Sequence, residues 1–277
     1  MRSASVNIVS PDLLPSHPPA IVSPICPASN FDITSASPDI APTPAARPSP
    51  QLRVGTWNVR SCGDLASSRS IDSLAPDCDV IVLQETHLSS SVSQTDNYNW
   101  YNSGTSGNSR ASRGVSVLVD RRLHVSAVHC HSPNLISVIL LVLDVIYHIF
   151  CCYSPANGAS NAADFYRSLH VALLSVDPSH YLLLAGDFNC HLGWVDVDEN
   201  DDRILGPVLG HEFTNENGHS LKDLAHCYSL KIATTLGTRR RDSSLLTTWK
   251  LGDRSSQLDH FLTRRLWRRS CTAFFLP

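Results

Sequence analysis

The pattern of apolar and polar positions changes character at Leu52. From there on, apolar runs of strand length alternate with stretches of helical spacing, whereas residues 1–50 follow neither period. Apolar runs rich in β-branched residues are typical of strands that pack on a core. We therefore predict strands in the following segments: 52–58, 79–85, 114–119, 135–143, 145–153, 181–187, 229–235, 246–250 and 257–263.

Two segments have the spacing of amphipathic helices instead. Apolar residues recur every three or four positions in 161–176, and Leu221 and Leu224 share one face of 216–227. A shorter helix is predicted within 64–74. Many strands with few helices predict an α/β fold in which a two-sheet β-sandwich is flanked by helices.

Residues 1–50 have a different composition. They hold eleven of the seventeen prolines and nine serines, with one aromatic residue, Phe31. Such a segment buries too little apolar area to offset the entropy of ordering it, so we predict a disordered arm. Residues 51–277 form the predicted domain, which is long enough for one sizeable core.

The segment 135–152 is the one stretch that resembles a membrane span. Asp144 and His148 lie within it, and both are costly in lipid. We predict two buried strands with a tight turn near Asp144, and no membrane partner. The N-terminus also lacks the basic residues and continuous apolar run of a signal peptide.

Composition excludes two classes of protein. A net charge of −3 does not fit a generally basic nucleic-acid-coating protein, so any DNA contact must be local. The nine cysteines are odd in number and scattered, which argues against a disulfide framework and a zinc knuckle. Reduced thiols in an intracellular protein are the simplest account.

Two charged segments stand out. The segment 239–269 carries nine basic residues against three aspartates, which fits either phosphate-backbone steering or a solvated basic face. The acidic run 195–202 resembles a calcium loop but has Asp201 where such loops need glycine, and Pro207 where they need glutamate. We therefore predict a solvated loop there.

Polar residues recur where the predicted strands end. Side chains at strand ends can be held by rigid elements around a ligand. The residues in such positions are Asn58, Glu85, Tyr153, Asp187, Asn189 and Asp259.

These residue types suit one chemistry. The Glu85 carboxylate and the Asn58 amide oxygen form a hard-oxygen set of the kind that Mg²⁺ prefers, with Mn²⁺ as the alternative ion. Asp187 and Asn189 are two residues apart, so an extended segment would place them on one face. An acid there can orient or deprotonate water, and the Tyr153 hydroxyl can donate to developing charge.

The motifs TWNVRS, QETH, YSPAN, GDFN, NENG, TTW and SQLDHFL occur in this order along the chain. In that order and rough spacing they resemble the DNase-I-like endonuclease/exonuclease/phosphatase superfamily. The resemblance is strongest to the DNA-nicking endonucleases of non-LTR retrotransposons and the related craniofacial-development-protein-like sequences. It covers residues from about 52 to 271.

The resemblance implies a role for each motif residue. Glu85 and Asn58 are similar to the metal site, and Asp187 to the water-positioning aspartate. The other implied roles are a phosphate contact for Asn189, an active-site tyrosine for Tyr153, site shaping or substrate binding for Asn217, substrate contact for Thr248, and support of the catalytic histidine or the metal for Asp259.

One family motif is missing. Relatives carry Ser-Asp-His shortly after LDHFL, but here the chain continues as LTRRLWRRSCTAFFLP and has no histidine after His260. We therefore expect the last strand to be missing, which would bare a sheet edge and part of the core. His260 adjoins Asp259 in an extended segment, so the two side chains should point to opposite faces.

Three functions stay open. The first is Mg²⁺-dependent nicking of DNA, with DNA as the partner, no obligate protein partner and a nuclear location implied by the substrate. The second is hydrolysis of a small phosphate ester by the same fold. The third is a catalytically dead remnant that binds DNA, which the missing motif supports.

Overall fold

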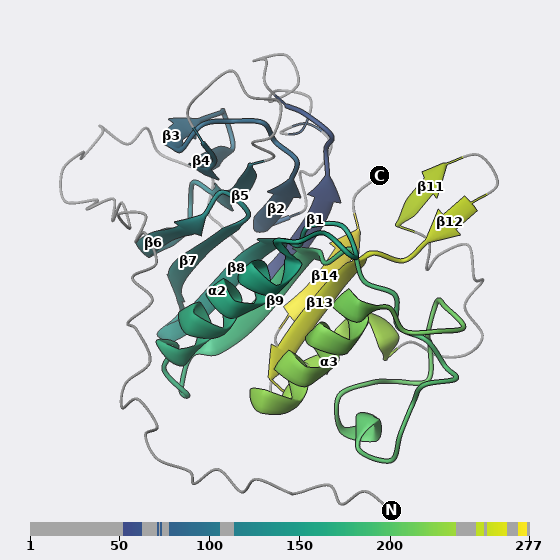
Figure 1. Ribbon diagram of the computed structural model, residues 1–277. Helices are drawn as coiled ribbons and strands as arrows, with labels where there is room; N and C mark the ends of the chain where they lie inside the picture. The colour runs from purple at the N-terminus through teal and green to yellow at the C-terminus, as the bar shows by residue number, and fades with distance from the viewer. Residues whose placement is uncertain are drawn as a thin grey trace, which may run out of the picture.

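The structure is a computed structural model that describes residues 52–62, 71, 73, 78–105, 114–236, 248–251, 254–264 and 271–275. These residues form two six-stranded sheets, a two-stranded sheet and two α-helices (Figure 1). The sheets pack face to face and the helices cover the outer face of one, so the predicted α/β two-sheet sandwich is confirmed. Residues 1–50 lie outside the described part of the chain.

The first sheet has the strand order β14-β1-β2-β5-β4-β3. Its strands are Leu52–Asn58 (β1), Val80–Gln84 (β2), Ser91–Gln94 (β3), Tyr98–Ser103 (β4), Val115–Asp120 (β5) and Cys271–Phe275 (β14).

The second sheet has the order β10-β13-β9-β8-β7-β6. Its strands are His124–Ser132 (β6), Leu135–Val142 (β7), Val145–Tyr153 (β8), Tyr181–Asp187 (β9), Leu230–Ile232 (β10) and Asp259–Arg264 (β13). Trp249–Leu251 (β11) and Arg254–Ser256 (β12) form the separate two-stranded sheet.

The direction of the strands brings the functional positions together at the carboxyl ends of neighbouring strands in each sheet. β1 and β2 are parallel, and β8 and β9 are parallel with the helix α2 (Ala162–Leu174) crossing between them. The carboxyl ends of each pair are therefore adjacent: Asn58 is in register with Gln84, and Tyr153 with Asp187.

The apolar segment 135–152 forms the predicted hairpin. β7 and β8 pair antiparallel up to Val142 and Val145, and the two residues between them, Leu143 and Asp144, have positive φ. Two-residue turns of this hand match the twist of the flanking strands. No helix in the described part of the chain is both long and apolar enough to cross a membrane.

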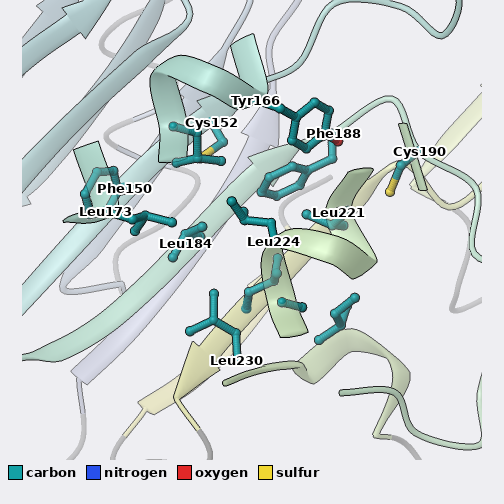
Figure 2. Close-up of a cluster of buried hydrophobic side chains, with 14 of the residues drawn as sticks. Phe150, Cys152, Tyr166, Leu173, Leu184, Phe188, Cys190, Leu221, Leu224 and Leu230 are labelled. Atoms are coloured by element: carbon teal, nitrogen blue, oxygen red, sulfur yellow. The ribbon is translucent and has the colours of Figure 1, made fainter. Parts of the chain in front are cut away.

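Three hydrophobic clusters hold the layers together. One lies between the sheets and includes Val82, Val117 and Ile149. A second lies under α2 and the helix α3 (Glu216–Cys227), where Figure 2 shows Leu173, Leu184 and Leu224 converging. A third covers the outer face of the first sheet. Both predicted helices therefore bury the faces that their spacing indicated.

Five strands were missed, namely β3, β4, β6, β12 and β14. β3 is fully exposed and β6 mostly half-exposed, and each lies at a sheet edge, where no continuous apolar run is required. In β4, aromatic residues alternate with asparagines. The predicted strand 229–235 ends at Ile232 and continues as a 3₁₀ turn. The short helix predicted within 64–74 lies mostly outside the described residues.

The expected bare sheet edge was wrong. Cys271–Phe275 forms β14, which runs parallel to β1 with Cys271 in register with Leu52. The backbone of β1 is thus paired on both sides, with β2 on one and β14 on the other. Pairing satisfies strand N–H and C=O groups that an open edge exposes.

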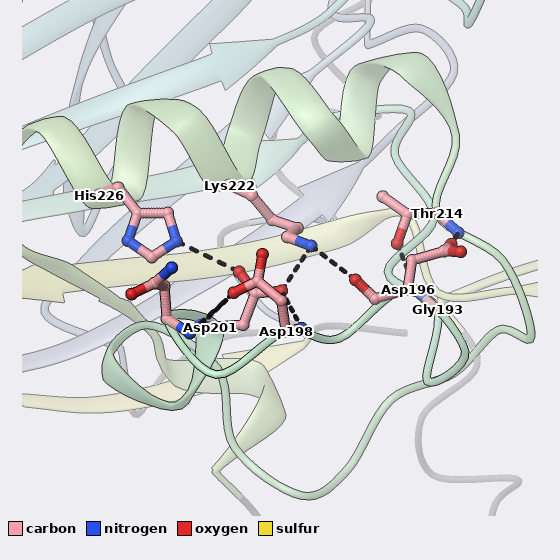
Figure 3. Close-up of polar contacts among 8 residues, drawn as sticks. Gly193, Asp196, Asp198, Asp201, Thr214, Lys222 and His226 are labelled. Atoms are coloured by element: carbon pink, nitrogen blue, oxygen red, sulfur yellow. Dashed lines mark hydrogen bonds and ion pairs between the residues drawn. The ribbon is translucent and has the colours of Figure 1, made fainter.

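The acidic run 195–202 is not simply solvated. Asp201 is 1% exposed and its carboxylate meets Lys222 Nζ at 2.5 Å and His226 Nε2 at 3.2 Å (Figure 3). Lys222 also donates to the Asp196 carbonyl at 3.1 Å. This buried cluster ties the loop after β9 to α3.

We expect Lys222→Met to destabilise the protein by about 3–5 kcal/mol, because it leaves the Asp201 carboxylate buried without its main counter-charge. Urea unfolding followed by circular dichroism measures this loss. Adding Asp201→Asn to Lys222→Met should recover most of the stability. A loss below about 1 kcal/mol in the single variant would contradict the importance of this ion pair.

Candidate functional site

The site forms where four strand ends meet. Asn58 ends β1, Glu85 directly follows β2, Tyr153 ends β8 and Asp187 ends β9. The first two belong to one sheet and the last two to the other. Face-to-face packing of the sheets brings the two pairs together.

Two hydrogen bonds join these residues across the sheets. Asn58 Nδ2 donates to Asp187 Oδ2 at 3.1 Å, and the Tyr153 hydroxyl donates to Glu85 Oε1 at 2.7 Å. The same Asn58 nitrogen donates to Glu85 Oε1 at 3.0 Å. Two carboxylates from different sheets are thus within hydrogen-bond distance of one nitrogen.

This arrangement fits a divalent cation. Asn58 Nδ2 marks a point that the Glu85 and Asp187 carboxylates both reach, and a cation there would meet hard oxygen donors. Turning the Asn58 amide over would offer its oxygen to the ion and release the 3.2 Å hydrogen bond from Arg60 N. Among the described residues no group of three or more His, Cys, Asp or Glu side chains is arranged to hold a metal ion. The protein donors at this point are therefore two carboxylates and one amide, a small set of the kind that Mg²⁺ completes with water and substrate oxygens.

The backbone at Glu85 is strained. Its φ of 56° lies in the left-handed region, which costs a non-glycine residue about 1–3 kcal/mol. The side chain is half-buried. Strain of this kind persists where surrounding structure fixes a side chain for a purpose, and here it aims the carboxylate at Asn58 and Tyr153.

Asp187 and Asn189 share the site by a different route from the one expected. Asn189 has φ 46°, so the segment turns instead of staying extended, and Asn189 N donates to Asp187 Oδ1 at 2.8 Å. Asn189 Nδ2 donates to the Ser154 carbonyl at 2.8 Å. The glycine of GDFN is needed because a Cβ on Gly186 would lie 2.0 Å from the Cys152 carbonyl oxygen.

Asp259 lies beside Asp187 in antiparallel register. It is 6% exposed, and its Oδ1 has no hydrogen-bond partner in the described part of the chain. Burial, then the Asp187 charge, raise the pKa of Asp259 to about 8, while a hydrogen bond from Thr248 opposes the shift. The Asp259 carboxyl therefore keeps its proton at neutral pH in the metal-free protein.

His260 points away from this cluster, as the alternation of an extended strand predicted. Its side chain is fully buried, and Nδ1 lies 2.9 Å from Thr234 Oγ1. Burial lowers the pKa of His260 to about 3. A permanently neutral, enclosed imidazole has no access to substrate.

Asn217 and Thr248 hold the site's frame. Asn217 is 2% exposed, and its Nδ2 faces three backbone carbonyls, those of Pro155, Phe188 and Asn189, at 2.9–3.3 Å. Thr248 Oγ1 accepts from the backbone N–H groups of Leu258 and Asp259 at 2.9 and 3.1 Å. Through these hydrogen bonds, both side chains position the loops around Asp187 and Asp259.

Asn215 was missed. It caps α3 by accepting from Gly218 N at 2.8 Å, and it also accepts from His191 N at 3.0 Å. Its amide donates to the Asn189 carbonyl at 3.3 Å. An asparagine just before a predicted helix is the signal that could have found it.

The basic segment 239–269 is only partly described. Residues 239–241, 265, 268 and 269 lie outside the described part. Arg264 Nη1 donates to carbonyls of Asp177, Pro178 and His180 at 2.8–3.2 Å. These lie before β9, at the end of the sheet opposite Asp187, so Arg264 does not border the candidate site.

Solved structures share this fold. The endonuclease domain of TRAS1, a telomere-specific non-LTR retrotransposon, has a TM-score of 0.51 and 13% identity, over 76% of this chain and 84% of that one. An AP endonuclease from Archaeoglobus fulgidus has a TM-score of 0.51 and 14% identity, over 78% and 87%. Among curated proteins, none is similar enough in sequence to count as a match.

The sequence model of the endonuclease/exonuclease/phosphatase family matches residues 55–277. That span begins inside β1 and contains Asn58, Glu85, Tyr153, Asp187 and Asp259. Since the match covers most of the chain and includes every strand end that meets at the site, the chain belongs to the endonuclease/exonuclease/phosphatase family.

Proposed function

We propose that this protein is a divalent-metal-dependent phosphodiester hydrolase that nicks DNA. The observation that carries the proposal is the shared nitrogen of Asn58, which places the carboxylates of Glu85 and Asp187 around one point. Enzymes of this family generally use divalent metals. Oxygen donors from two sheets around one point suit such an ion.

Glu85 and Asn58 would hold the ion, Mg²⁺ or alternatively Mn²⁺. When bound, it supplies positive charge next to a phosphoryl oxygen. The Tyr153 hydroxyl fixes the Glu85 carboxylate through its 2.7 Å hydrogen bond. The strained backbone at Glu85 keeps that carboxylate directed into the site.

Asp187 would orient the attacking water and accept its proton. Its Oδ1 stays held by Asn189 N, which limits the rotation of the carboxylate. Its Oδ2 would lose the hydrogen bond from Asn58 Nδ2 once the Asn58 amide turns its oxygen toward the ion, and could then meet the water. The second N–H of the Asn189 amide remains for a phosphoryl oxygen. Fixed donors and acceptors of this kind reduce the reorganisation that the transition state requires.

DNA is proposed as the substrate for two reasons. The motif order resembles the DNA-nicking endonucleases of retrotransposons, and the solved structures that share the fold include a retrotransposon endonuclease domain and an AP endonuclease. A nuclear location would follow from such a substrate.

A second function, DNA binding with little hydrolysis, is favoured by one observation. Asp259 Oδ1 has no hydrogen-bond partner among the described residues, and the neighbouring His260 side chain is fully buried against Thr234. A positioned acid–base group typically contributes about 10²–10⁴ in rate. A protein in which no histidine meets Asp259 is therefore expected to nick DNA slowly.

Supercoiled plasmid incubated with the full chain and Mg²⁺ should convert slowly to the nicked form. EDTA should abolish the conversion because it removes the ion, and Glu85→Ala should abolish it because the ion loses its carboxylate ligand. Asp223→Ala, which removes an exposed carboxylate from α3, is the matched control and should nick like wild type. Salt-sensitive DNA binding without any nicking would support the second function instead.

Asp259 predicts a pH effect on stability in EDTA. A carboxyl with a raised pKa stabilises the fold fully below its unfolded pKa near 4, and this contribution is lost as pH rises to about 8. Relative to Asp259→Asn, we expect wild type to lose up to about 1.4 kcal/mol per pH unit across this window. Urea unfolding between pH 5 and 8 measures the difference, and parallel pH profiles would contradict it.

A further inference from the structure

The loop between β9 and α3 carries two segments, 191–195 and 211–215, that lie side by side. Gly193 and His211 form a parallel bridge, and Trp194 N donates to the His211 carbonyl at 3.2 Å. Gly193 N donates to Thr214 Oγ1 at 3.0 Å. The backbones approach so closely that a Cβ on Gly193 would lie 2.4 Å from the Phe213 carbonyl carbon. We call this pair of segments the aromatic ribbon.

The aromatic ribbon is fixed to the candidate site at both of its segments. Asn215 accepts from His191 N at 3.0 Å and donates to the Asn189 carbonyl at 3.3 Å. His211 Nε2 lies 3.3 Å from the Gln257 carbonyl, two residues before Asp259. The ribbon therefore borders the cleavage site instead of lying elsewhere on the surface.

The ribbon presents aromatic rings to solvent. Trp194 is 57% and Phe213 58% exposed, and no other tryptophan or phenylalanine is exposed among the residues whose burial the structure describes. Between the two segments, the rings of His191 and His211 stack with centroids 3.8 Å apart and planes 8° apart. Burial lowers the pKa of both histidines, so the rings are uncharged at neutral pH.

Charge on this loop decides what kind of contact is possible. The carboxylate of Asp196 is turned inward onto Thr214 N at 2.5 Å, and Asp201 is paired with Lys222 (Figure 3). The acids of this loop that remain exposed are Asp198, Glu199, Asp202 and Glu212, and Arg203 is the basic residue exposed among them. Carboxylates here would repel the phosphates of a strand, so a contact with this surface must be made between the aromatic rings and the uncharged faces of bases.

We propose that Trp194 and Phe213 stack on unpaired bases of a nucleic-acid strand whose phosphate lies at the Asp187 site. The inference rests on the proposed function and deepens it, because it makes single-stranded or locally unpaired DNA the preferred substrate. Every base has a flat face, so aromatic stacking holds a strand without reading its sequence. Neighbouring bases lie within reach of any phosphate in the site, and the ribbon is anchored two residues from Asn189.

The test is binding of the full chain to a fluorescein-labelled oligothymidine in EDTA at low salt, followed by anisotropy. Trp194→Ala and Phe213→Ala should each raise the Kd about tenfold, within the range of roughly 5–150-fold that loss of one stacked base gives. Trp194→Phe should restore most of the affinity. Leu174→Ala, at a 67% exposed residue of α2, is the matched control and should bind like wild type.

A duplex of the same length should respond less than twofold to either alanine variant. Unchanged oligothymidine binding in Trp194→Ala, or no binding by the wild-type chain, overturns the proposal, and the ribbon then serves a protein contact or another role. Plasmid nicking judges the proposed function separately. If nicking depends on Glu85 but Trp194→Ala does not change binding, only the proposed base stacking is rejected. If binding depends on the aromatic residues but no nicking occurs, only the proposed hydrolase activity is rejected.

Discussion

The structure of this site depends on polar contacts made across the two sheets. Asn58 and Asp187 are 129 positions apart in the chain and are joined by a hydrogen bond. Together with the hydrogen bond from Tyr153 to Glu85, it fixes the strand ends of one sheet against those of the other. Polar groups buried at such an edge cost free energy unless they find partners. A relative shift of the sheets would break both contacts, so the same bonds define the sandwich and place the acids for chemistry.

The residues around the acids serve mainly to keep that geometry. Asn217, Asn215 and Thr248 bind backbone groups of the loops that carry Asn189 and Asp259. Glu85 and Asn189 adopt left-handed backbone conformations. Asn215 and Asn217 bind the Asn189 carbonyl, whereas the Glu85 side chain is held by Asn58 and Tyr153. Rigid support of this kind is what positions reacting groups within fractions of an ångström.

The loop between β9 and α3 links stability to recognition. Its buried ion cluster at Asp201 anchors it to α3, and its other end pairs 191–195 with 211–215. With most polar groups of the loop satisfied internally, Trp194 and Phe213 are left facing solvent beside the site. Exposed aromatic area in a fixed position is typical of a binding surface.

The sequence by itself determined the buried strands other than β4, both helices and the strand-end positions of Asn58, Glu85, Tyr153 and Asp187, because periodicity records which face of a local element is buried. Only the tertiary structure decided that the Asn217 and Thr248 side chains bond backbone groups, that Asp201 is buried, and that β14 pairs with β1. Exposed strands such as β3 leave no apolar pattern, and hydrogen-bond partners come from distant segments. Those outcomes depend on how the layers pack, which no local period encodes.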